Sequence, residues 1–410
     1  MIFSTTSVPP VYKVVFKYFV YDIAWFGVLN GSILTFLSVY LTRIGASTSE
    51  VGVLSAAPAV IAVLFALPSG NWLVGKPIGI ITFWASLVNR IFYLGLIPFA
   101  LLFSNEIQRY LIMGMIILMS VPGTILVVGF NPLFGEHIPN EWRGYVAGLR
   151  NAAFAIVSMG TTLISGQILN RFPFTTGYLI IFALGFLGAM MSSFYLLRIS
   201  RLKNVETSNV VKSENNQEEV KKLPGILHWE AITTHFKTVL ILIFFFHLFQ
   251  YLPIPLFPPF LVRHLFLTDS TISLGMTLFS LGNFLGSTQL AWLTGKFGNK
   301  FLVGFGLICM STYPAMFALA HEQILYLVAS ITGGVAWSMA GGALFNYLLE
   351  GIPPQKRPGY FGWYNMVANL AILLGSTLGP AIGSVLDIRL AFWIFAMLRL
   401  IGGAAILRWG

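Results

Sequence analysis

The ionisable residues inside long apolar stretches of this sequence include Asp22, Arg90 and His247. A charged side chain is costly in apolar surroundings, so it needs a partner or a function there. A carboxylate can exchange a proton, an arginine can hold that carboxylate charged, and a histidine titrates near neutral pH. These three residues are therefore the candidates for proton coupling.

Asp22 and Arg90 fall at similar depth in two stretches that run in the same direction, so their side chains can pair. Two interpretations of such a pair are open. A static ion pair would fix the first half of the chain, whereas a pair opened by protonation or by substrate would take part in function. His247 is the alternative coupling residue, although a lone buried histidine commonly serves structure.

Five polar or aromatic residues share a helical face with these groups or form a polar stripe of their own: Trp25, Gln250, Tyr251, Asn365 and Asn369. Polar groups turned toward lipid would lack hydrogen-bond partners, so such faces meet another helix or a central cavity. We predict that these five residues contact a solute. An aromatic belt at the membrane interface is the alternative for the aromatic face of residues 18–25.

The composition identifies the elements that must position these residues. Of 410 residues, 57% are hydrophobic and 9% are charged, against about 25% charged in soluble domains. This balance excludes a soluble domain and a disordered chain. The single cysteine excludes an intramolecular disulfide framework and a cysteine-based metal cluster. Apolar runs of about 20 residues are typical of membrane-spanning helices and not of barrel strands.

The apolar runs predict an all-α membrane protein with twelve transmembrane helices. The predicted spans are 15–41, 51–73, 78–103, 109–134, 145–170, 174–198, 238–264, 271–293, 300–320, 323–349, 360–386 and 389–408. With the N-terminus inside, 17 of the 24 Lys and Arg residues fall on the cytoplasmic side, five outside and two within spans. This asymmetry predicts a multi-pass protein of the plasma membrane with both termini in the cytoplasm.

The predicted spans divide six and six. Residues 199–237 are polar and of mixed charge, which predicts a flexible cytoplasmic linker between an N-terminal half, 1–198, and a C-terminal half, 238–410. A repeat relates the halves at an offset of 214 residues, and its first copy consists of Glu136, Ile138, Pro139, Arg143, Gly148 and Asn151. Two six-helix halves related by an internal repeat are a transporter architecture.

The loop 291–300, AWLTGKFGNK, resembles the signature of the major facilitator superfamily, Gly-x-Leu-x-Asp-Arg/Lys-x-Gly-Arg/Lys-Arg/Lys. The matching residues are Leu293, Lys296, Gly298 and Lys300, and a weaker copy contains Leu73 and Lys76. The acidic residue of the signature is replaced by Gly75 and Gly295. In the family this carboxylate helps to lock one conformation, so the resemblance implies that this chain locks differently.

The resemblance implies two pseudo-symmetric six-helix bundles and a proton-coupled secondary transporter. Residues 375–383 also resemble the GxxxGPxxG signature of drug–proton antiporters, but they lie in the eleventh span, where we interpret the small residues as a packing surface. The repeated loop pairs, Glu136 with Arg143 and Glu350 with Arg357, are candidates for cytoplasmic gate contacts. Ordinary solvated loops are the alternative.

Prolines interrupt the seventh span after the His247 face, at positions 253, 255, 258 and 259, and predict a broken helix that bends at an outer gate. Arg399 has no acidic residue within the spans of its half. Three roles are open for Arg399: it caps backbone carbonyls, it extends to the membrane interface, or it contacts an anionic substrate.

The leading functional hypothesis is a secondary active transporter that moves a small, hydrophobic or amphipathic solute by alternating access. The alternative is a non-transporting membrane protein of the same fold, such as a pigment or lipid assembly factor or a sensor. The sequence contains no catalytic or nucleotide-binding motif. We therefore expect no enzymatic activity, cofactor, metal or nucleic-acid partner, and a monomer in the lipid bilayer.

Overall fold

The structure is a computed structural model that describes residues 10–73, 75–202, 236–350, 352 and 357–410. Within these ranges the regular secondary structure is entirely helical, which confirms the predicted all-α fold. Most of the predicted linker, residues 203–235, lies outside the described residues.

The first half of the chain forms long helices joined by short turns. They are α1 (Pro10–Leu29), a π-helical turn (Asn30–Leu34), α2 (Thr35–Arg43), α3 (Thr48–Leu73), α4 (Ile78–Ile91), a 3₁₀ turn (Phe92–Gly95), α5 (Leu96–Leu102), α6 (Asn105–His137), α7 (Asn140–Arg171) and α8 (Phe174–Ser200). Pro139 and Pro173 are the residues directly before α7 and α8. Each has an extended backbone, with ψ of 148° and 150°, and each lacks the N–H group that a residue inside a helix would donate.

The second half is also built mainly of long helices joined by short turns. Its elements are α10 (Phe236–Tyr251), a 3₁₀ turn (Ile254–Leu256), α11 (Phe257–Pro259), a π-helical turn (Phe260–His264), α12 (Asp269–Phe297), α13 (Asn299–Met310), α14 (Thr312–Leu319), α15 (Gln323–Glu350), α16 (Arg357–Val385) and α17 (Ile388–Trp409). The predicted break in the seventh span is confirmed, because α10 ends before Pro253 and short turns follow it.

Eleven helical segments of the described chain are long and apolar enough to cross a membrane. They coincide with eleven of the twelve predicted spans. The remaining predicted span, 271–293, forms the 29-residue helix α12, whose serine, threonine, asparagine and glutamine residues make it less apolar. The count of twelve therefore stays a prediction.

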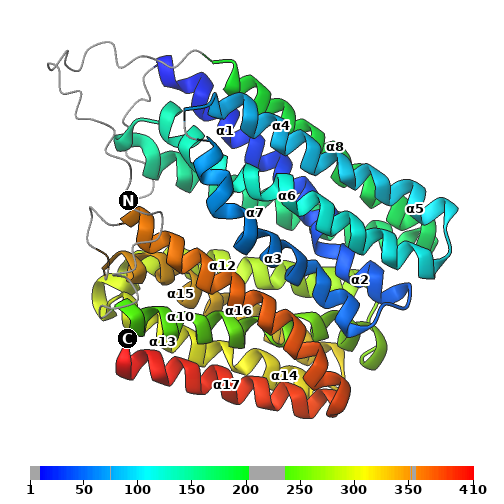
Figure 1. Cartoon of the computed structure of the whole chain (residues 1–410). Helices are drawn as coiled ribbons and strands as arrows, with labels where there is room; N and C mark the ends of the chain where they lie inside the picture. The colour runs from blue at the N-terminus through cyan, green and yellow to red at the C-terminus, as the bar shows by residue number, and fades with distance from the viewer. Residues whose placement is uncertain (1–9, 74, 203–235, 351, 353–356) are drawn as a thin grey trace, which may run out of the picture.

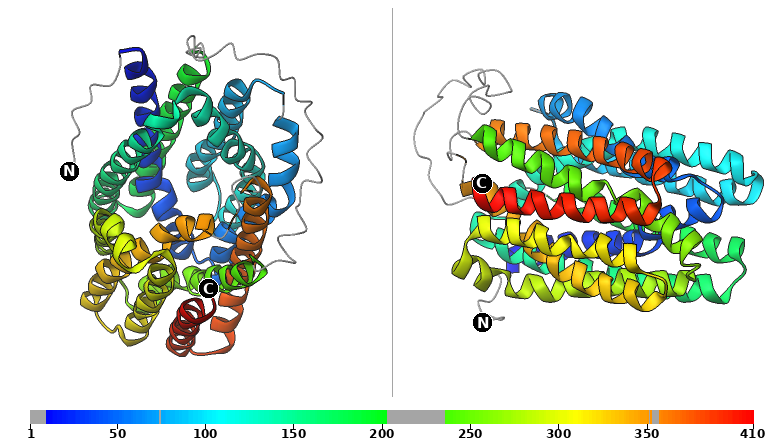
Figure 2. Two further views of the ribbon diagram at one scale, coloured as in Figure 1. Left: turned by 90° about the vertical axis from the view of Figure 1, so that its left-hand side faces the viewer. Right: turned by 90° about the horizontal axis from the view of Figure 1, so that it is seen from below.

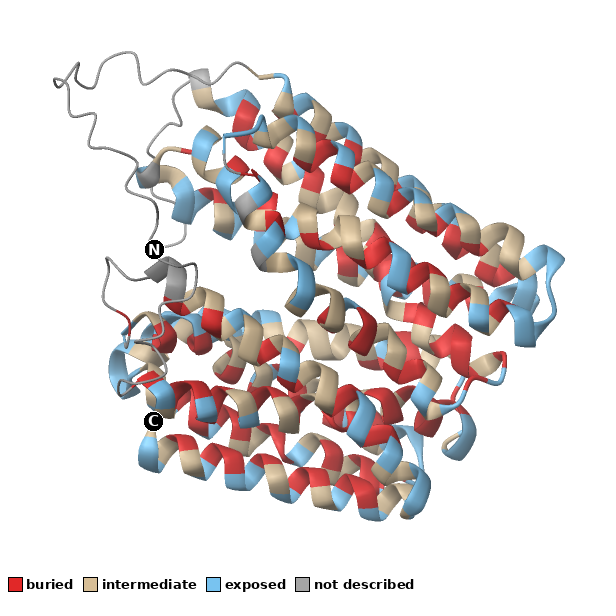
Figure 3. Cartoon of the chain, viewed as in Figure 1, coloured by how far each residue is buried: buried red, intermediate tan, exposed pale blue. Residues whose placement is uncertain are grey.

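The helices pack into two groups that lie side by side (Figures 1 and 2). In the first group α1 packs on α7 and α8, and α3 and α4 pack on α6. In the second, α15 packs on α12 and α13, and α10 packs on α16. The pairs α3–α16 and α7–α12 join the groups. Buried residues follow the sides on which helices face one another (Figure 3).

The small residues of α16 allow α10 to approach closely, as predicted from their spacing. A Cβ atom at Gly379 would overlap the carbonyl oxygen of Leu252, and one at Gly375 would lie 2.9 Å from the Cβ of Tyr251. The backbones thus touch where α10 is broken. This contact fixes the position of the break against α16.

Candidate functional site

The buried carboxylate of Asp22 is the centre of a polar cluster among α1, α4, α7 and α8. Asp22 is 3% exposed. Its Oδ1 accepts a hydrogen bond of 2.5 Å from the hydroxyl of Ser192, and its Oδ2 lies 3.7 Å from Nη2 of Arg150. We call Asp22, Arg90, Arg150 and Ser192 the buried charge cluster.

The structure corrects the predicted contact between Asp22 and Arg90. Arg90 is 4% exposed and acts on Asp22 only through its charge. Its Nη1 donates to the carbonyl oxygen of Ala189 at 3.4 Å and to the hydroxyl of Ser193 at 3.0 Å. The residue in ion-pair contact with Asp22 is Arg150.

Sequence reasoning missed Arg150, which it counted among the cytoplasmic charges although the predicted span 145–170 includes it. Because α7 begins at Asn140, Arg150 lies ten residues into the helix, about 15 Å along its axis. The guanidinium packs against the rings of Phe130, Phe134 and Phe19, at 4.4, 5.7 and 5.5 Å from their centroids. The signal that locates it is Pro139, which marks the helix start.

His247 and Gln250 lie on one face of α10 and are 8% and 9% exposed. Neither ring nitrogen of His247 has a hydrogen-bond partner within the described chain, and the same holds for Oε1 of Gln250. The His247 ring lies 6.0 Å from that of Tyr364 on α16. These two side chains therefore offer unused hydrogen-bonding atoms in the second half.

Arg399 on α17 is completely buried and is held by backbone carbonyls. It donates from Nε to Phe249 at 3.2 Å, from Nη2 to Gln250 at 2.9 Å and from Nη1 to Met310 at 3.0 Å. Phe249 and Gln250 end α10, and Met310 ends α13. The negative ends of two helix dipoles thus compensate the charge, and of the three predicted roles the structure shows carbonyl capping.

The other predicted cavity residues lie apart from this cluster. Trp25 is partly exposed, on the α1 face that packs on α8. Tyr251 is partly buried beside Gly375 of α16. Asn365 and Asn369 donate to the backbone of their own helix, to Phe361 and Asn365 respectively. Both asparagine side chains keep acceptor oxygens for a further partner.

Arginine contacts join the two halves at the end of the molecule away from the termini. Arg43 of α2 lies 3.0 Å from Oδ1 of Asp269 and donates to the carbonyl of Leu267 at 2.7 Å. Arg263, in the second half, donates to two carbonyls of the first half, those of Thr42 at 3.2 Å and of Ala46. We call Arg43, Arg263 and Asp269 the outer contact cluster, after the side of the membrane that the distribution of basic residues predicts for this end. In Figure 1 the two groups of helices meet at this end and lie farther apart at the end that carries the termini.

The signature loops lie at the opposite end and are held by contacts within their own half. Lys76 packs over the ring of Trp72 at 3.7 Å, and Lys296 packs over Trp292 at 5.1 Å. Gly75 adopts a positive φ of 72°, which disfavours the carboxylate that the signature has there. Two further signature residues lie at the start of α13. Gly298, directly before the helix, has a φ of 81°, and Lys300, the second residue of the helix, is partly exposed.

The predicted gate pair of Glu136 and Arg143 forms no ion pair within the described chain. Glu136 is exposed, and Arg143 donates to the carbonyls of Ile138 and Gly135 at 3.0 and 2.7 Å. Glu350 accepts a hydrogen bond of 2.6 Å from Asn299. The side chain of Arg357 lies outside the described part of the structure.

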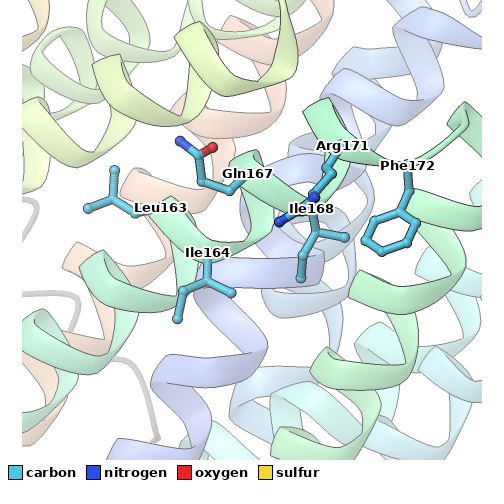
Figure 4. A pocket seen from close by; sticks show the side chains of 6 residues that line it. All are labelled: Leu163, Ile164, Gln167, Ile168, Arg171 and Phe172. Carbon is cyan, nitrogen blue, oxygen red and sulfur yellow. The ribbon is translucent and has the colours of Figure 1, made fainter.

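A separate pocket of about 340 Å³ lies at the C-terminal end of α7 (Figure 4). Its lining residues are Leu163, Ile164, Gln167, Ile168, Arg171 and Phe172. It shares no residue with the buried charge cluster. Among the described residues no group of three histidine, cysteine or acidic side chains is arranged to hold a metal ion.

The sequence of the second half matches a known family. Residues 239–410 match the family model of the Major Facilitator Superfamily. Quinolone resistance protein NorA of Staphylococcus aureus (strain MRSA252) is 27% identical over 134 residues, which is 33% of this chain and 34% of NorA. A probable sugar efflux transporter of Helicobacter pylori (strain G27) is 26% identical over 164 residues, 40% of each chain. The matched part of this chain thus spans about a third of NorA.

The fold of the whole chain is similar to solved transporter structures. The D-xylose-proton symporter superposes with a TM-score of 0.70 at 16% identity, covering 96% of this chain and 97% of the symporter. The nucleoside transporter NupG gives 0.67 at 15%, covering 96% and 98%. A bacterial homologue of the iron transporter ferroportin, in an inward-facing state, gives 0.70 at 13%, covering 97% and 98%. The second half of the chain thus matches the Major Facilitator Superfamily model, and the fold of the whole chain is similar to that of these solved transporters.

Proposed function

We propose that this protein is a secondary active transporter that moves a small solute by alternating access between its two halves. The observation that carries the proposal is the outer contact cluster. It joins the halves at one end of the bundle, while the loop charges at the other end are bonded within their own halves. Two rigid halves that meet at one end are what a rocking mechanism requires.

The positive-inside asymmetry assigns the two ends to the two sides of the plasma membrane. The termini and the linker lie in the cytoplasm, so the outer contact cluster faces outward. In this proposal the described conformation is an inward-facing state, the state named for the ferroportin homologue. Contacts at Arg43 and Arg263 hold the outer end closed in this state.

Asp22 is the coupling residue of the proposed mechanism. It is the carboxylate at membrane depth, and its ion-pair partner is in loose contact at 3.7 Å. If the environment of Asp22 differs between the inward-facing and outward-facing states, its proton affinity differs too, and protons can then drive the conformational change. The protein acts as a monomer in this scheme, since both halves are on one chain.

The solute is small and is bound between the halves by Gln250, Tyr251, Asn365, Asn369 and Trp25. The named relatives are linked to quinolone resistance and to sugar efflux, and the solved structures to nucleosides and D-xylose. A quinolone, a sugar and a nucleoside are therefore the first three probes for transport.

Proteoliposomes with an imposed pH gradient test the proposal. The wild-type protein should accumulate at least one of the three radiolabelled probes against its gradient. Asp22→Asn should lose accumulation but keep exchange of the probe across the membrane, because the amide keeps the size and cannot titrate. Gradient-driven accumulation by Asp22→Asn with wild-type pH dependence would show that Asp22 is not the coupling residue, and His247 would then be tested.

The test of alternating access needs no substrate. Spin labels at Ser49 and Glu322 report the outer end, and labels at Glu141 and Phe297 report the inner end, after replacement of the native cysteine. A change of pH should move the two distance distributions in opposite directions. Distributions that stay fixed between acidic and alkaline pH, and on addition of each probe, would contradict alternating access.

A further inference from the structure

The charges of the buried charge cluster do not balance. Asp22, Arg90 and Arg150 are 3%, 4% and 9% exposed, so one carboxylate faces two guanidinium groups at membrane depth. An unmatched charge in such surroundings is costly unless polar groups or a counter-ion compensate it. The question is which arginine lacks compensation.

Arg150 is that arginine. Arg90 has a carbonyl and a hydroxyl as acceptors, and Arg399 has three carbonyls at two helix ends. The Nη1 of Arg150 is buried and has no hydrogen-bond partner in the described chain. Its Nη2 is 3.7 Å from Asp22, beyond the range of a hydrogen bond. Phenylalanine rings cover much of the remaining surface of the guanidinium.

The arrangement also ties Arg150 to the protonation of Asp22. The charged and titratable groups around Asp22 are Arg90 from α4 and Arg150 from α7, while α8 contributes the hydroxyl of Ser192. On α6, His137 packs against Phe19, three residues from Asp22 on α1. A proton on Asp22 removes the negative charge that faces both arginines. An anion beside Arg150 would restore it.

We propose that Arg150 binds an anionic group, a carboxylate of the solute or a small inorganic anion, and that this anion binds together with a proton on Asp22. The proposal rests on the proposed transport function and names the class of solute. Proton and anion bind as an electroneutral pair, so the net charge of the cluster does not change, and the anion replaces the carboxylate of Asp22 as the partner of Arg150. The unpartnered Nη1 of Arg150 is the donor for an anionic oxygen or a halide.

The sign of the pH dependence follows. At low pH Asp22 is protonated, Arg150 is free of its carboxylate, and the anion binds tightly. As the pH rises and Asp22 ionises, the carboxylate repels the anion and the affinity falls. A neutral solute of the same shape gains nothing from the protonation of Asp22.

Binding to the purified protein tests this inference without any transport. The probes are sodium 2-naphthoate, its neutral amide 2-naphthamide, and sodium bromide as a competitor, measured by calorimetry at pH 5.5 and pH 8. The wild-type protein should bind naphthoate about tenfold or more tightly at the lower pH, and naphthamide equally weakly at both. Displacement of naphthoate by bromide identifies a site for any small anion, whereas resistance to bromide identifies a carboxylate site.

The variants separate the roles of the two residues. Arg150→Gln should weaken naphthoate binding about tenfold or more at pH 5.5. Asp22→Asn should bind naphthoate tightly at both pH values, because the amide imitates the protonated acid. Arg201→Gln, which removes an exposed guanidinium directly after α8, is the control and should bind as the wild type does.

Three outcomes would overturn the inference: no binding of naphthoate or bromide to the wild type, equal binding of naphthoate and naphthamide, or unchanged naphthoate binding by Arg150→Gln. If Arg150→Gln does not fold, Arg150→Lys replaces it. Lysine keeps the charge and loses the guanidinium geometry, so weaker but pH-dependent binding is expected and unchanged affinity counts against the role of Arg150.

Anion binding without accumulation of any probe would contradict only the transport function. Accumulation that depends on Asp22, without anion binding, would contradict only this inference.

Discussion

Three buried arginines show how differently one side chain can be accommodated at membrane depth. Arg399 is compensated by the carboxyl-terminal ends of two helices, Arg90 by a carbonyl and a hydroxyl, and Arg150 by aromatic rings and a distant carboxylate. The first arrangement is saturated with hydrogen bonds, and the last is not. We propose that structural and functional roles divide along this difference, with Arg399 serving structure and Arg150 serving function.

At the residue scale we predict that Arg399→Met destabilises the protein by about 3 kcal/mol, because three carbonyls at the ends of α10 and α13 lose a charged donor. Arg399→Lys should also destabilise it, since an ammonium group cannot reach all three. Thermal unfolding of the purified variants measures both effects. A melting temperature for Arg399→Met equal to that of the control Arg201→Gln would show that the carbonyls do not need the guanidinium.

At the scale of the helices, the close approach of α10 to α16 depends on the absence of a side chain at Gly379. We predict that Gly379→Ala destabilises the protein by about 2 kcal/mol, because the added Cβ overlaps the carbonyl oxygen of Leu252. Gly160→Ala is the control, since a Cβ at that helical position meets no atom within 4 Å. Chemical or thermal unfolding compares the two, and equal stability would mean that the helices can separate freely.

The broken segment after α10 is the second feature at this scale. Pro255 and Pro258 lie in the short turns that replace a regular helix. We predict that the double replacement Pro255→Ala with Pro258→Ala straightens the segment and shifts the conformational equilibrium, because regular hydrogen bonding becomes available to both residues. Spin labels at Ser49 and Glu322 report the shift. Distance distributions identical to the wild type would remove these prolines from the gate.

At the scale of the whole molecule, the proposed mechanism makes the outer contact cluster responsible for the balance between the inward-facing and outward-facing states. We predict that Asp269→Asn populates a state with a wider outer end, because it weakens the ion pair with Arg43 while keeping the size of the side chain. A partly exposed pair of this kind contributes about 1 kcal/mol, enough to change the ratio of the states several-fold. The distance between labels at Ser49 and Glu322 should increase. Glu322 and Ser49 labels that report an unchanged distribution would place the control of the equilibrium elsewhere.

The sequence by itself determined the helical membrane fold, because span length and hydropathy are local properties of the chain. It also located the break after α10 and the packing surface of α16, since proline and small residues act through their own backbone. Asp22, Arg90, His247 and Arg399 could be named as buried from their position in apolar runs.

Only the tertiary structure decided which of these residues meet. Arg150 was hidden because a basic residue near a predicted helix start resembles an ordinary cytoplasmic charge, whereas α7 begins far enough before it to bury it. The partners of Arg399 are carbonyls, which every sequence contains and no pattern marks. The contacts of Arg43 and Arg263 join residues more than 200 positions apart. Such contacts depend on how two packed halves are placed in space, and local sequence carries no record of that placement.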